Sequence, residues 1–261
     1  MKRVVYAMPG NEDMADALAR RLRLARHTLD LHRFPDGETL VHLQKPPTGA
    51  EALIVCTMNG PNEKTVPLLM AADTVRELGA SRVGLIAPYL AYLRQDMRFR
   101  AGDAVSARLF GRLLREHFEW QVTVDPHLHR LRSLADAGMP DGKAVSAAPA
   151  LAEWLQAHVQ QPLLIGPDEE SAPWVESVAR LIGAPTVVAA KRRTGDREVS
   201  MRWPDLTAWR EHRPVLLDDI ISSGHTLLTA VAHLRAAGLP APWCVAVHGL
   251  FADDALGRLY A

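Results

Sequence analysis

The sequence is poor in cysteine, has no net charge and contains no long apolar run. Two cysteines among 261 residues are too few for a disulfide framework, and a chain of this length can bury a core without one. Basic and acidic residues are equal in number, 30 of each, whereas a nucleic-acid-binding protein usually has a basic excess. No apolar run approaches the length that spans a bilayer. We therefore expect neither a nucleic acid nor a membrane among the partners.

The N-terminal segment also lacks the features of a secretory signal. Its apolar stretch, Val4–Pro9, is shorter than the hydrophobic region of such a signal, and no small-residue cleavage site follows. We therefore expect a cytoplasmic protein. The two cysteines, Cys56 and Cys244, lie in short apolar runs typical of strands. Buried free thiols are the favoured interpretation of both, with a disulfide between them as the alternative.

Lysine is scarce as well, since arginine makes up most of the 30 basic residues. The guanidinium group of arginine is a planar fork that binds carboxylates and phosphates in two places. Its excess indicates either sites for such groups or a plain bias in composition. The bias is the simpler explanation.

Short apolar runs alternate with longer helical patterns along most of the chain, which is typical of an α/β fold. Strands are expected at residues 4–9, 52–57, 82–87, 121–124, 163–166, 186–190, 198–202, 214–217 and 243–247. Helices are expected at residues 11–25, 65–78, 104–117, 149–158, 173–181 and 226–237. A turn-rich stretch, residues 137–143, interrupts this order. We therefore predict two similar lobes, residues 1–147 and 148–261, each a mainly parallel sheet flanked by helices.

The segment Pro214–Thr226 has the pattern of a phosphate-binding loop. An apolar strand leads through a small-residue loop into the first turn of a helix. The N-terminus of a helix presents unpaired amides and the positive end of a dipole, which together favour a phosphate group. Ser222, Ser223 and Thr226 add hydroxyl donors, and Gly224 allows the backbone to approach a ligand closely.

Two carboxylates, Asp218 and Asp219, precede this loop. They would repel a phosphate, but they are suited to accept hydrogen bonds from neighbouring sugar hydroxyls, directly or through Mg²⁺. The alternative interpretation is structural: Ser222 or Ser223 caps the helix, and the two aspartates are solvated.

An acidic pair followed by a Ser/Thr/Gly loop resembles the ribose-phosphate-binding motif of the type I phosphoribosyltransferase fold. Within that fold, the chain is similar to the ribose-phosphate diphosphokinase family, also called phosphoribosyl pyrophosphate (PRPP) synthetases, from about Arg33 to Val247. Five separated motifs occur in the family's order. The resemblance implies two phosphoribosyltransferase-like lobes. It also implies that ribose 5-phosphate is bound by Asp218, Asp219, Ser222, Ser223, Gly224, His225 and Thr226, although His225 replaces the small residue usual in the family.

The segment Arg33–Glu38 resembles the family's Phe-x-Asp-Gly-Glu loop, which reaches the adenine of ATP from a neighbouring subunit. The resemblance implies that Phe34, Asp36 and Glu38 bind ATP, and that the protein forms a homo-oligomer, either a dimer or a dimer-based hexamer. The residues alone predict a hairpin turn between strands at residues 28–33 and 39–43.

The segment Pro88–Arg100 is similar to the family's long loop around Tyr-x-x-x-Arg-Gln-Asp. By this resemblance Arg94 contacts the phosphates of ATP and Gln95 contacts the base. The alternative is a solvated basic loop whose arginines are balanced by Asp96 and Asp103.

The resemblance also implies Mg²⁺ as the cofactor. Val124–His127 resembles the family's Asp-x-His motif, in which the histidine binds Mg²⁺, and Asp168 corresponds to the second carboxylate of the metal site. His127 and Asp168 are therefore the predicted metal ligands. The continuation Glu169–Ser171 departs from the usual glycine-containing pattern, and its two extra carboxylates could hold a metal or repel phosphate.

Lys191–Arg193 resembles the family's catalytic loop, and Lys191 and Arg193 are the predicted catalytic residues. Negative charge builds up on phosphate oxygens during transfer, and cations that close over the site stabilise it. The alternative is a solvated charge cluster before Gly195.

The activity implied by the resemblance converts ATP and ribose 5-phosphate into PRPP and AMP. The 1-hydroxyl of the ribose attacks the β-phosphorus of ATP, and AMP leaves. Two alternatives stay open: a non-catalytic homologue that regulates a partner, and a phosphoribosyltransferase that consumes PRPP. The second would need the sugar loop but not the Phe34, Arg94 and Lys191 motifs.

Overall fold

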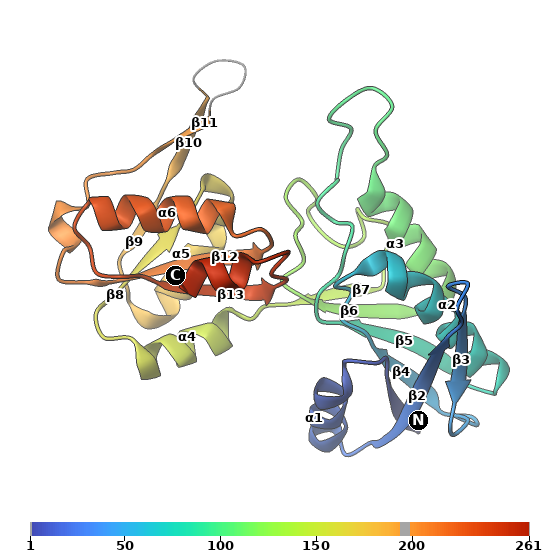
Figure 1. Ribbon diagram of the computed structural model, residues 1–261. Coiled ribbons are helices and arrows are strands. Elements are labelled where there is room, and N and C mark those ends of the chain that lie inside the picture. The colour runs from blue at the N-terminus through green and yellow to red at the C-terminus, as the bar shows by residue number, and fades with distance from the viewer. Residues whose placement is uncertain (1, 194–198, 261) are drawn as a thin grey trace. The chain divides into compact units, whose positions relative to one another are not determined.

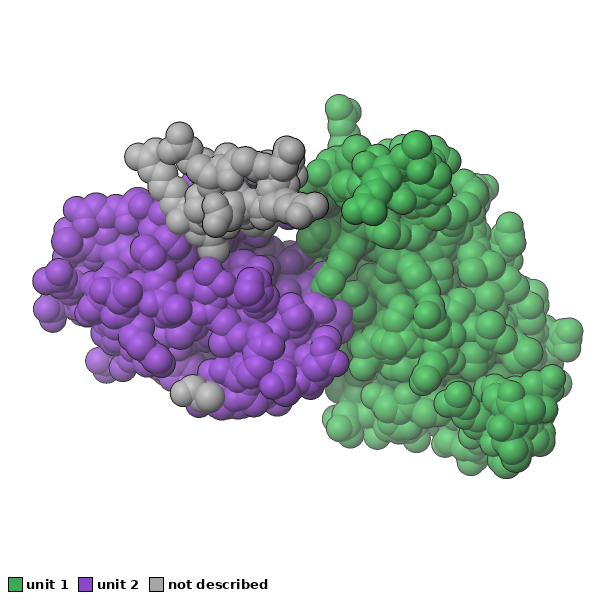
Figure 2. Space-filling model, turned by 45° about the horizontal axis from the view of Figure 1, so that its top comes forward, with its two compact units in different colours: residues 1–145 green, residues 146–261 purple. Residues whose placement is uncertain are grey.

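The computed structural model describes residues 2–193 and 199–260, with the strands alone described at residues 191–193 and 199–202. The chain forms two compact units, residues 1–145 and 146–261 (Figure 2). Each unit is built around a mainly parallel sheet with helices packed against it (Figure 1). The predicted α/β class is therefore confirmed.

Unit 1, residues 1–145, contains a seven-stranded sheet in the order β3-β2-β1-β4-β5-β6-β7. Every neighbouring pair is parallel except β2 and β3. The strands are β1 (Arg3–Ala7), β2 (Ala25–Arg33), β3 (Thr39–Leu43), β4 (Glu51–Val55), β5 (Arg82–Ala87), β6 (Trp120–Val124) and β7 (Gly142–Val145). The helices are α1 (Glu12–Leu22), α2 (Pro61–Glu77) and α3 (Ser106–His117). The carboxyl ends of the parallel strands therefore share one edge of the sheet, where open α/β sheets bind their ligands.

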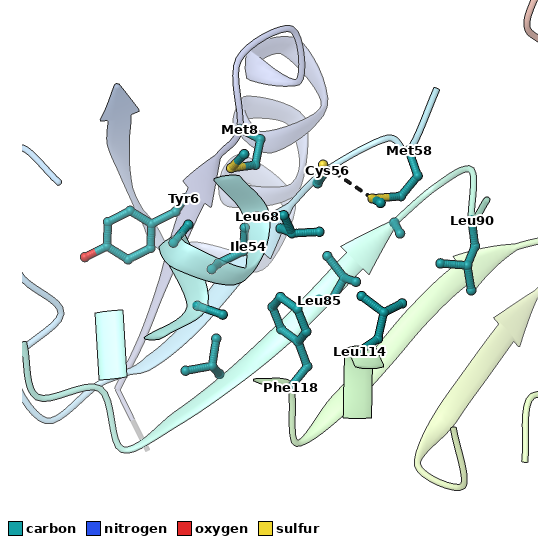
Figure 3. Close-up of a cluster of buried hydrophobic side chains, with 14 of the residues drawn as sticks. Tyr6, Met8, Ile54, Cys56, Met58, Leu68, Leu85, Leu90, Leu114 and Phe118 are labelled. Atoms are coloured by element: carbon teal, nitrogen blue, oxygen red, sulfur yellow. Dashed lines mark hydrogen bonds between the residues drawn. The ribbon is translucent and has the colours of Figure 1, made fainter. Parts of the chain in front are cut away.

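The core of unit 1 has two layers because successive strand residues point to opposite faces. Val4 and Tyr6 of β1 pack in the larger cluster with residues of α2 and α3, whereas Val5 and Ala7 pack with α1. Figure 3 shows the larger cluster, in which the Cys56 thiol lies 3.7 Å from the sulfur of Met58. Cys56 and Cys244 are both free thiols, so the disulfide alternative is excluded.

Burial weakens the acidity of both thiols. It raises the pKa of the buried Cys56 to about 12 and that of the half-buried Cys244 to about 11. Because the thiolate is the reactive form, neither cysteine is a nucleophile near neutral pH.

The amino edge of the unit 1 sheet contains a buried carboxylate. Glu51 is 2% exposed and accepts hydrogen bonds from Trp120 Nε1 and Arg3 Nε, both at 2.9 Å. Burial alone would raise the pKa of Glu51, but the hydrogen bonds from Trp120 and Arg3 hold it below its usual range. The Trp120 ring lies directly over Gly84, where an added Cβ would stand 2.0 Å from ring atom Cζ2. Only glycine fits at this place.

The predicted hairpin is confirmed and extends beyond the rest of the sheet. Strand β2 pairs with β1 through Ala25–Thr28. Its continuation, Leu29–Arg33, pairs antiparallel with β3. Five residues of strand amount to about 17 Å. The turn between these strands therefore lies at the tip of a two-stranded arm on the edge of unit 1.

Unit 2, residues 146–261, contains a parallel four-stranded sheet in the order β13-β12-β8-β9 and a separate antiparallel pair, β10 and β11. The strands are β8 (Pro162–Gly166), β9 (Thr186–Val188), β10 (Ala190–Arg193), β11 (Val199–Arg202), β12 (Arg213–Ile221) and β13 (Trp243–Gly249). The helices are α4 (Ala148–His158), α5 (Ala172–Ile182), α6 (His225–Ala236) and α7 (Ala255–Tyr260), with 3₁₀ turns at Glu169–Ser171 and Thr207–Trp209. Helices α4 and α5 pack in one core cluster and α6 in the other.

Several elements of unit 2 and its boundary differ from the sequence prediction. Strand β12 continues through the acidic pair to Ile221, and the strand expected at residues 186–190 ends at Val188, with β10 beginning at Ala190. Strand β7 begins within the turn-rich stretch, and α7 was not predicted. Within the described residues, no helix is both long and apolar enough to cross a membrane.

Candidate functional site

Three carboxylates meet at the carboxyl edge of the unit 2 sheet. Asp168 follows β8, and Asp218 and Asp219 lie near the end of β12, the strand that pairs with β8. All three belong to the predicted site. The structure therefore brings together side chains that are about 50 positions apart in the sequence.

The ionisation of Asp218 shows how crowded this edge is. Burial, the charge of Asp219 and the charge of Asp168 together raise the pKa of Asp218 to about 7. The Asp219 amide donates a hydrogen bond to Asp218 Oδ1 at 2.9 Å, which offsets part of this effect. Like charges held this closely favour a ligand that brings hydroxyl donors or a cation.

The predicted phosphate loop lies directly beside the acidic pair. Ser222 and Ser223 follow β12, and α6 begins at His225. Gly224 is the N-cap of this helix, with a φ of 71°, a left-handed conformation that favours glycine. No side chain caps this helix end, so the interpretation of Ser222 or Ser223 as a cap is wrong. The first amides of α6 have no acceptor within the helix and are available to an anion.

The chain after β13 holds the phosphate loop in place by donating hydrogen bonds to carbonyl groups at the end of β12 and in the loop. The amide of Leu250 donates to Ile221 O at 2.8 Å, and the amide of Ala252 donates to Ser222 O at 3.0 Å. Arg258 of α7 donates to Ser223 O at 3.4 Å. These long-range contacts leave no local signal in the sequence, which is why the role of this segment was not predicted.

Asp168 lies in a short turn of its own. It is the N-cap of the 3₁₀ turn Glu169–Ser171, and its side chain accepts a hydrogen bond from the Ser171 amide. Glu169 and Glu170, the two extra carboxylates, have exposed side chains, whereas Ser171 is buried. The run of three acidic residues is therefore divided between the half-buried Asp168 and an exposed pair.

Phe34, Asp36 and Glu38 form the tip of the unit 1 hairpin. The Phe34 amide donates to Glu38 O at 2.8 Å, and Asp36 Oδ1 accepts from the Glu38 amide at 3.1 Å. Gly37 has a φ of 94°, which this turn requires. All three predicted ATP-binding side chains are exposed, and the Phe34 ring is in edge contact with His32. The tip is an ordered turn whose aromatic and acidic groups face solvent.

Arg94 and Gln95 occupy a loop between β5 and α3 and are also exposed. Gln95 Oε1 accepts a hydrogen bond from Ser106 Oγ at 2.8 Å, which fixes the amide of Gln95 at the start of α3. Asp96 is buried and binds Arg130. Asp96 therefore anchors the loop to Arg130, which lies outside the loop.

His127 is half-buried and lies just beyond β6. The backbone before it bends sharply, since Asp125 has a φ of 34° and donates its amide to Val145 O at 2.9 Å. The His127 and His129 rings have centroids 5.6 Å apart. Tyr92, close to Arg94 in the chain, has a φ of 64°. Non-glycine residues with positive φ are uncommon and often accompany functional loops.

The sheet order of unit 1 separates the hairpin tip from the other predicted site residues of this unit. The hairpin tip extends from β2, whereas Arg94 follows β5 and His127 follows β6. Strands β1, β4 and β5 stand between β2 and β6. Four strand spacings correspond to about 19 Å. One copy of unit 1 therefore does not bring Phe34 and His127 together.

Lys191 and Arg193 belong to β10, where they pair in register with Met201 and Val199 of β11. Their side chains lie outside the described part of the chain. Just after β11, the Trp203 ring stacks on His233 of α6, with centroids 4.8 Å apart and planes within 11°. This contact joins the end of the β10–β11 pair to α6.

Comparison with known proteins gives a consistent result for both units. The family model of the N-terminal domain of ribose phosphate pyrophosphokinase matches residues 3–117, and that of the phosphoribosyl transferase domain matches residues 142–255. The chain is similar to the ribose-phosphate pyrophosphokinase of Thermococcus kodakarensis, at 33% identity over 88% of this chain and 81% of that protein. It is also similar to that of Methanopyrus kandleri, at 31% identity over 99% of this chain and 88% of that protein.

A solved structure has the same fold. The crystal structure of phosphoribosylpyrophosphate synthetase from Mycobacterium smegmatis matches with a TM-score of 0.85, covering 99% of this chain and 85% of that chain, at 24% sequence identity. Both proteins thus contain two phosphoribosyltransferase-like units.

Proposed function

The chain belongs to the ribose-phosphate pyrophosphokinase family, and we propose that it is the enzyme that makes PRPP and AMP from ATP and ribose 5-phosphate. The oxygen of the ribose 1-hydroxyl forms a bond to the β-phosphorus of ATP and loses its proton. The bond from the β-phosphorus to the oxygen that bridges to the α-phosphorus breaks, and AMP leaves.

One observation supports this function more than any other: a group of carboxylates lies directly beside an open helix N-terminus. Asp218 and Asp219 precede the loop, and the first amides of α6 follow Gly224. Carboxylates accept hydrogen bonds from sugar hydroxyls, and amides at a helix N-terminus bind phosphate. A phosphorylated sugar offers both groups in one small molecule. This edge of unit 2 is therefore the proposed ribose 5-phosphate site, and Ser222, Ser223, His225 and Thr226 stay predicted contacts.

The donor set of the same edge fits Mg²⁺. Asp168, Asp218 and Asp219 offer hard carboxylate oxygens, and burial together with the neighbouring carboxylates raises the pKa of Asp218. Asp168 in unit 2 and His127 in unit 1 remain the predicted ligands. When bound, the cation would neutralise charge on the phosphate oxygens of ATP.

The remaining predicted residues have roles that follow from charge. Lys191 and Arg193 would stabilise the charge that builds up on the transferred group, and Arg94 would bind the phosphates of ATP. Phe34 would stack on the base, while Asp36, Glu38 and Gln95 would accept or donate hydrogen bonds at its edge.

A homo-oligomer is part of the proposal. Phe34 at the hairpin tip and His127 do not meet within a single unit 1, because about 19 Å of sheet separates β2 from β6. A second copy of the chain supplies the hairpin in our proposal, which requires at least a dimer. A cytoplasmic location is also part of the proposal.

The test is a direct assay of the purified protein. It is incubated with ATP, Mg²⁺ and ribose 5-phosphate, and AMP and PRPP are measured. Equal amounts of both products, absent without ribose 5-phosphate, are expected. A folded protein that makes neither product overturns the proposal and favours a regulatory homologue. A protein that instead consumes PRPP with free bases is a phosphoribosyltransferase.

A further inference from the structure

The residues that depart from the family pattern after Asp168 have a specific structural effect. We propose that Ser171 is a positioning residue: it fixes the Asp168 carboxylate in the orientation that binds a divalent cation. This inference rests on the proposed function, which makes Asp168 a metal ligand. It goes further because it gives Ser171 an indirect role in metal binding, which Ser171 exerts by orienting Asp168.

Ser171 holds both the side chain and the backbone of Asp168. Its amide donates to Asp168 Oδ1 at 3.2 Å, and its hydroxyl donates to Asp168 O at 2.6 Å. The same amide also lies 3.2 Å from Asp168 O. Ser171 is 7% exposed, so these bonds are protected from competition with water. One oxygen of the Asp168 carboxylate is thereby fixed, and the direction of the other follows from it.

The end of strand β8 provides the space for the Ser171 hydroxyl. A Cβ added to Gly166 would lie 2.5 Å from Ser171 Oγ. The nearest other atoms, Val188 Cγ2 and Asp168 O, would be 3.4 and 3.5 Å away. Because Gly166 has no side chain, there is room for the Ser171 hydroxyl. A side chain at residue 166 would displace this hydroxyl.

Asp168 needs such a restraint because its neighbours repel it. Asp168 and Asp218 carry charges of the same sign at one edge of the sheet, because β8 pairs with β12. A freely rotating Asp168 side chain would turn away from Asp218 in the absence of a cation. Groups that hydrogen-bond to a metal ligand and hold its orientation typically change metal affinity when they are removed.

The two residues between Asp168 and Ser171 differ from Asp168 in exposure. Both side chains are exposed, whereas Asp168 is half-buried. The bonds between Ser171 and Asp168 close the 3₁₀ turn that contains these two residues.

The test measures Mn²⁺ binding to the full-length protein by electron paramagnetic resonance, without nucleotide or sugar. Ser171→Ala is expected to weaken Mn²⁺ binding about three- to tenfold. Gly166→Ala, which displaces the hydroxyl by another route, is expected to weaken it by a similar factor. The matched control is Ser177→Ala on α5, which is expected to bind Mn²⁺ as the wild type does. Thermal unfolding establishes that each variant is folded.

A double-mutant cycle separates positioning from a general structural effect. In an Asp168→Ala background, Ser171→Ala is expected to cause no further loss of Mn²⁺ affinity, because Ser171 acts through Asp168. An equal loss in both backgrounds, or wild-type affinity in both Ser171→Ala and Gly166→Ala, overturns the proposal. Mn²⁺ binding that does not depend on Asp168 also overturns it. Failure of the proposed function is read separately, from the AMP and PRPP assay of the wild type.

Discussion

Arg130 binds the carboxylate of Asp96 twice. Its Nη1 lies 3.1 Å from Asp96 Oδ1, and its backbone amide donates to Asp96 Oδ2 at 2.9 Å. Asp96 directly follows Gln95, and Arg130 belongs to the segment that contains His127. The pair therefore connects the two parts of unit 1 that contain predicted ATP-binding and metal-binding residues.

Asp96→Ala is expected to raise the KM for ATP about tenfold and to change the KM for ribose 5-phosphate much less. The Asp96 side chain is fully buried in this ion pair, and its loss frees the loop that presents Arg94. Steady-state kinetics with each substrate varied in turn provide the measurement. Asp141→Ala, at an exposed position of the same unit, serves as the control. Equal increases in both KM values would contradict a role confined to the ATP loop.

Asp218→Asn is expected to stabilise the protein at neutral and alkaline pH. The pKa of Asp218 is raised to about 7 in the folded protein, whereas in the unfolded chain it is about 3.9. Between about pH 4 and pH 7 the folded protein therefore retains a proton on Asp218 that the unfolded chain has lost. Stability conferred by this proton is therefore lost as the pH rises through that window. The variant should unfold a few degrees higher than the wild type at pH 8 and at a similar temperature at pH 4.

Differential scanning calorimetry across this pH range checks the Asp218 prediction, with the exposed Glu153→Gln on α4 as the control. The same Asp218 variant should bind ribose 5-phosphate more weakly, because it loses a charged acceptor for sugar hydroxyls. A stability gain that is as large at pH 4 as at pH 8 would refute the electrostatic explanation.

Gly84→Ala is expected to destabilise unit 1 by about 1–3 kcal/mol or more. The added methyl group would stand 2.0 Å from the Trp120 ring, and moving that ring would strain its hydrogen bond to Glu51. Gly257→Ala, in a helix with no atom within 4 Å of the added Cβ, should be neutral or slightly stabilising. Urea unfolding of both variants gives the comparison. The cost at Gly84 should shrink in a Trp120→Ala background.

Lys191→Ala and Arg193→Ala are each expected to lower kcat by about 10²–10³ with little effect on the KM for ribose 5-phosphate, because they remove charge stabilisation during transfer. Arg192→Ala removes the same charge from the residue between them and is the matched control. Rapid-quench measurement of AMP formation isolates the chemical step. Equal losses of kcat in all three variants would indicate a general electrostatic effect rather than specific roles for Lys191 and Arg193.

Mixing two inactive variants is expected to restore activity. A Phe34→Ala/Asp36→Ala chain lacks the hairpin groups, and a Lys191→Ala chain lacks a predicted catalytic cation. If one copy completes the ATP site of another, mixed oligomers contain sites with neither defect. AMP formation after co-refolding should exceed the sum of the separate variants, reaching up to about a quarter of wild type in a random dimer. Absence of any gain in oligomers proven to be mixed would exclude the shared site.

The local pattern predicted most of the fold because its signals are short-range. The hairpin around Pro35–Gly37 and the end of α6 before Gly238 depend on turn and capping residues that act over a few positions. Strand β7 was missed because Gly142 belongs to a turn-rich stretch and its register depends on pairing with β6. Strand β12 is longer than predicted because Asp218, normally a poor strand residue, and then Ile220 and Ile221 pair with β13 beyond the predicted end of the strand at residue 217.

From the residues alone, the candidate site was predictable only where its parts are contiguous in the chain, whereas His127 and Asp168 were assigned by the resemblance to the family. The acidic pair and its loop form one segment, so their chemistry could be read directly. The approach of Asp168 to Asp218 depends on the pairing of β8 with β12, and the bond from Arg130 to Asp96 joins segments 34 positions apart. The spacing of Asp168 and Ser171 did contain a usable signal, because an aspartate commonly caps the amide three residues later.

The two raised thiol pKa values make the wild-type chain a convenient background for site-specific labelling. At pH 7 neither Cys56, near 12, nor Cys244, near 11, presents an appreciable thiolate fraction to a maleimide. A single cysteine introduced at the exposed hairpin tip, for example Pro35→Cys, would therefore react selectively without removal of the native ones. A fluorophore attached there would report the environment of the arm in real time, and its change in anisotropy or emission on addition of ATP would follow nucleotide arrival at the hairpin independently of turnover.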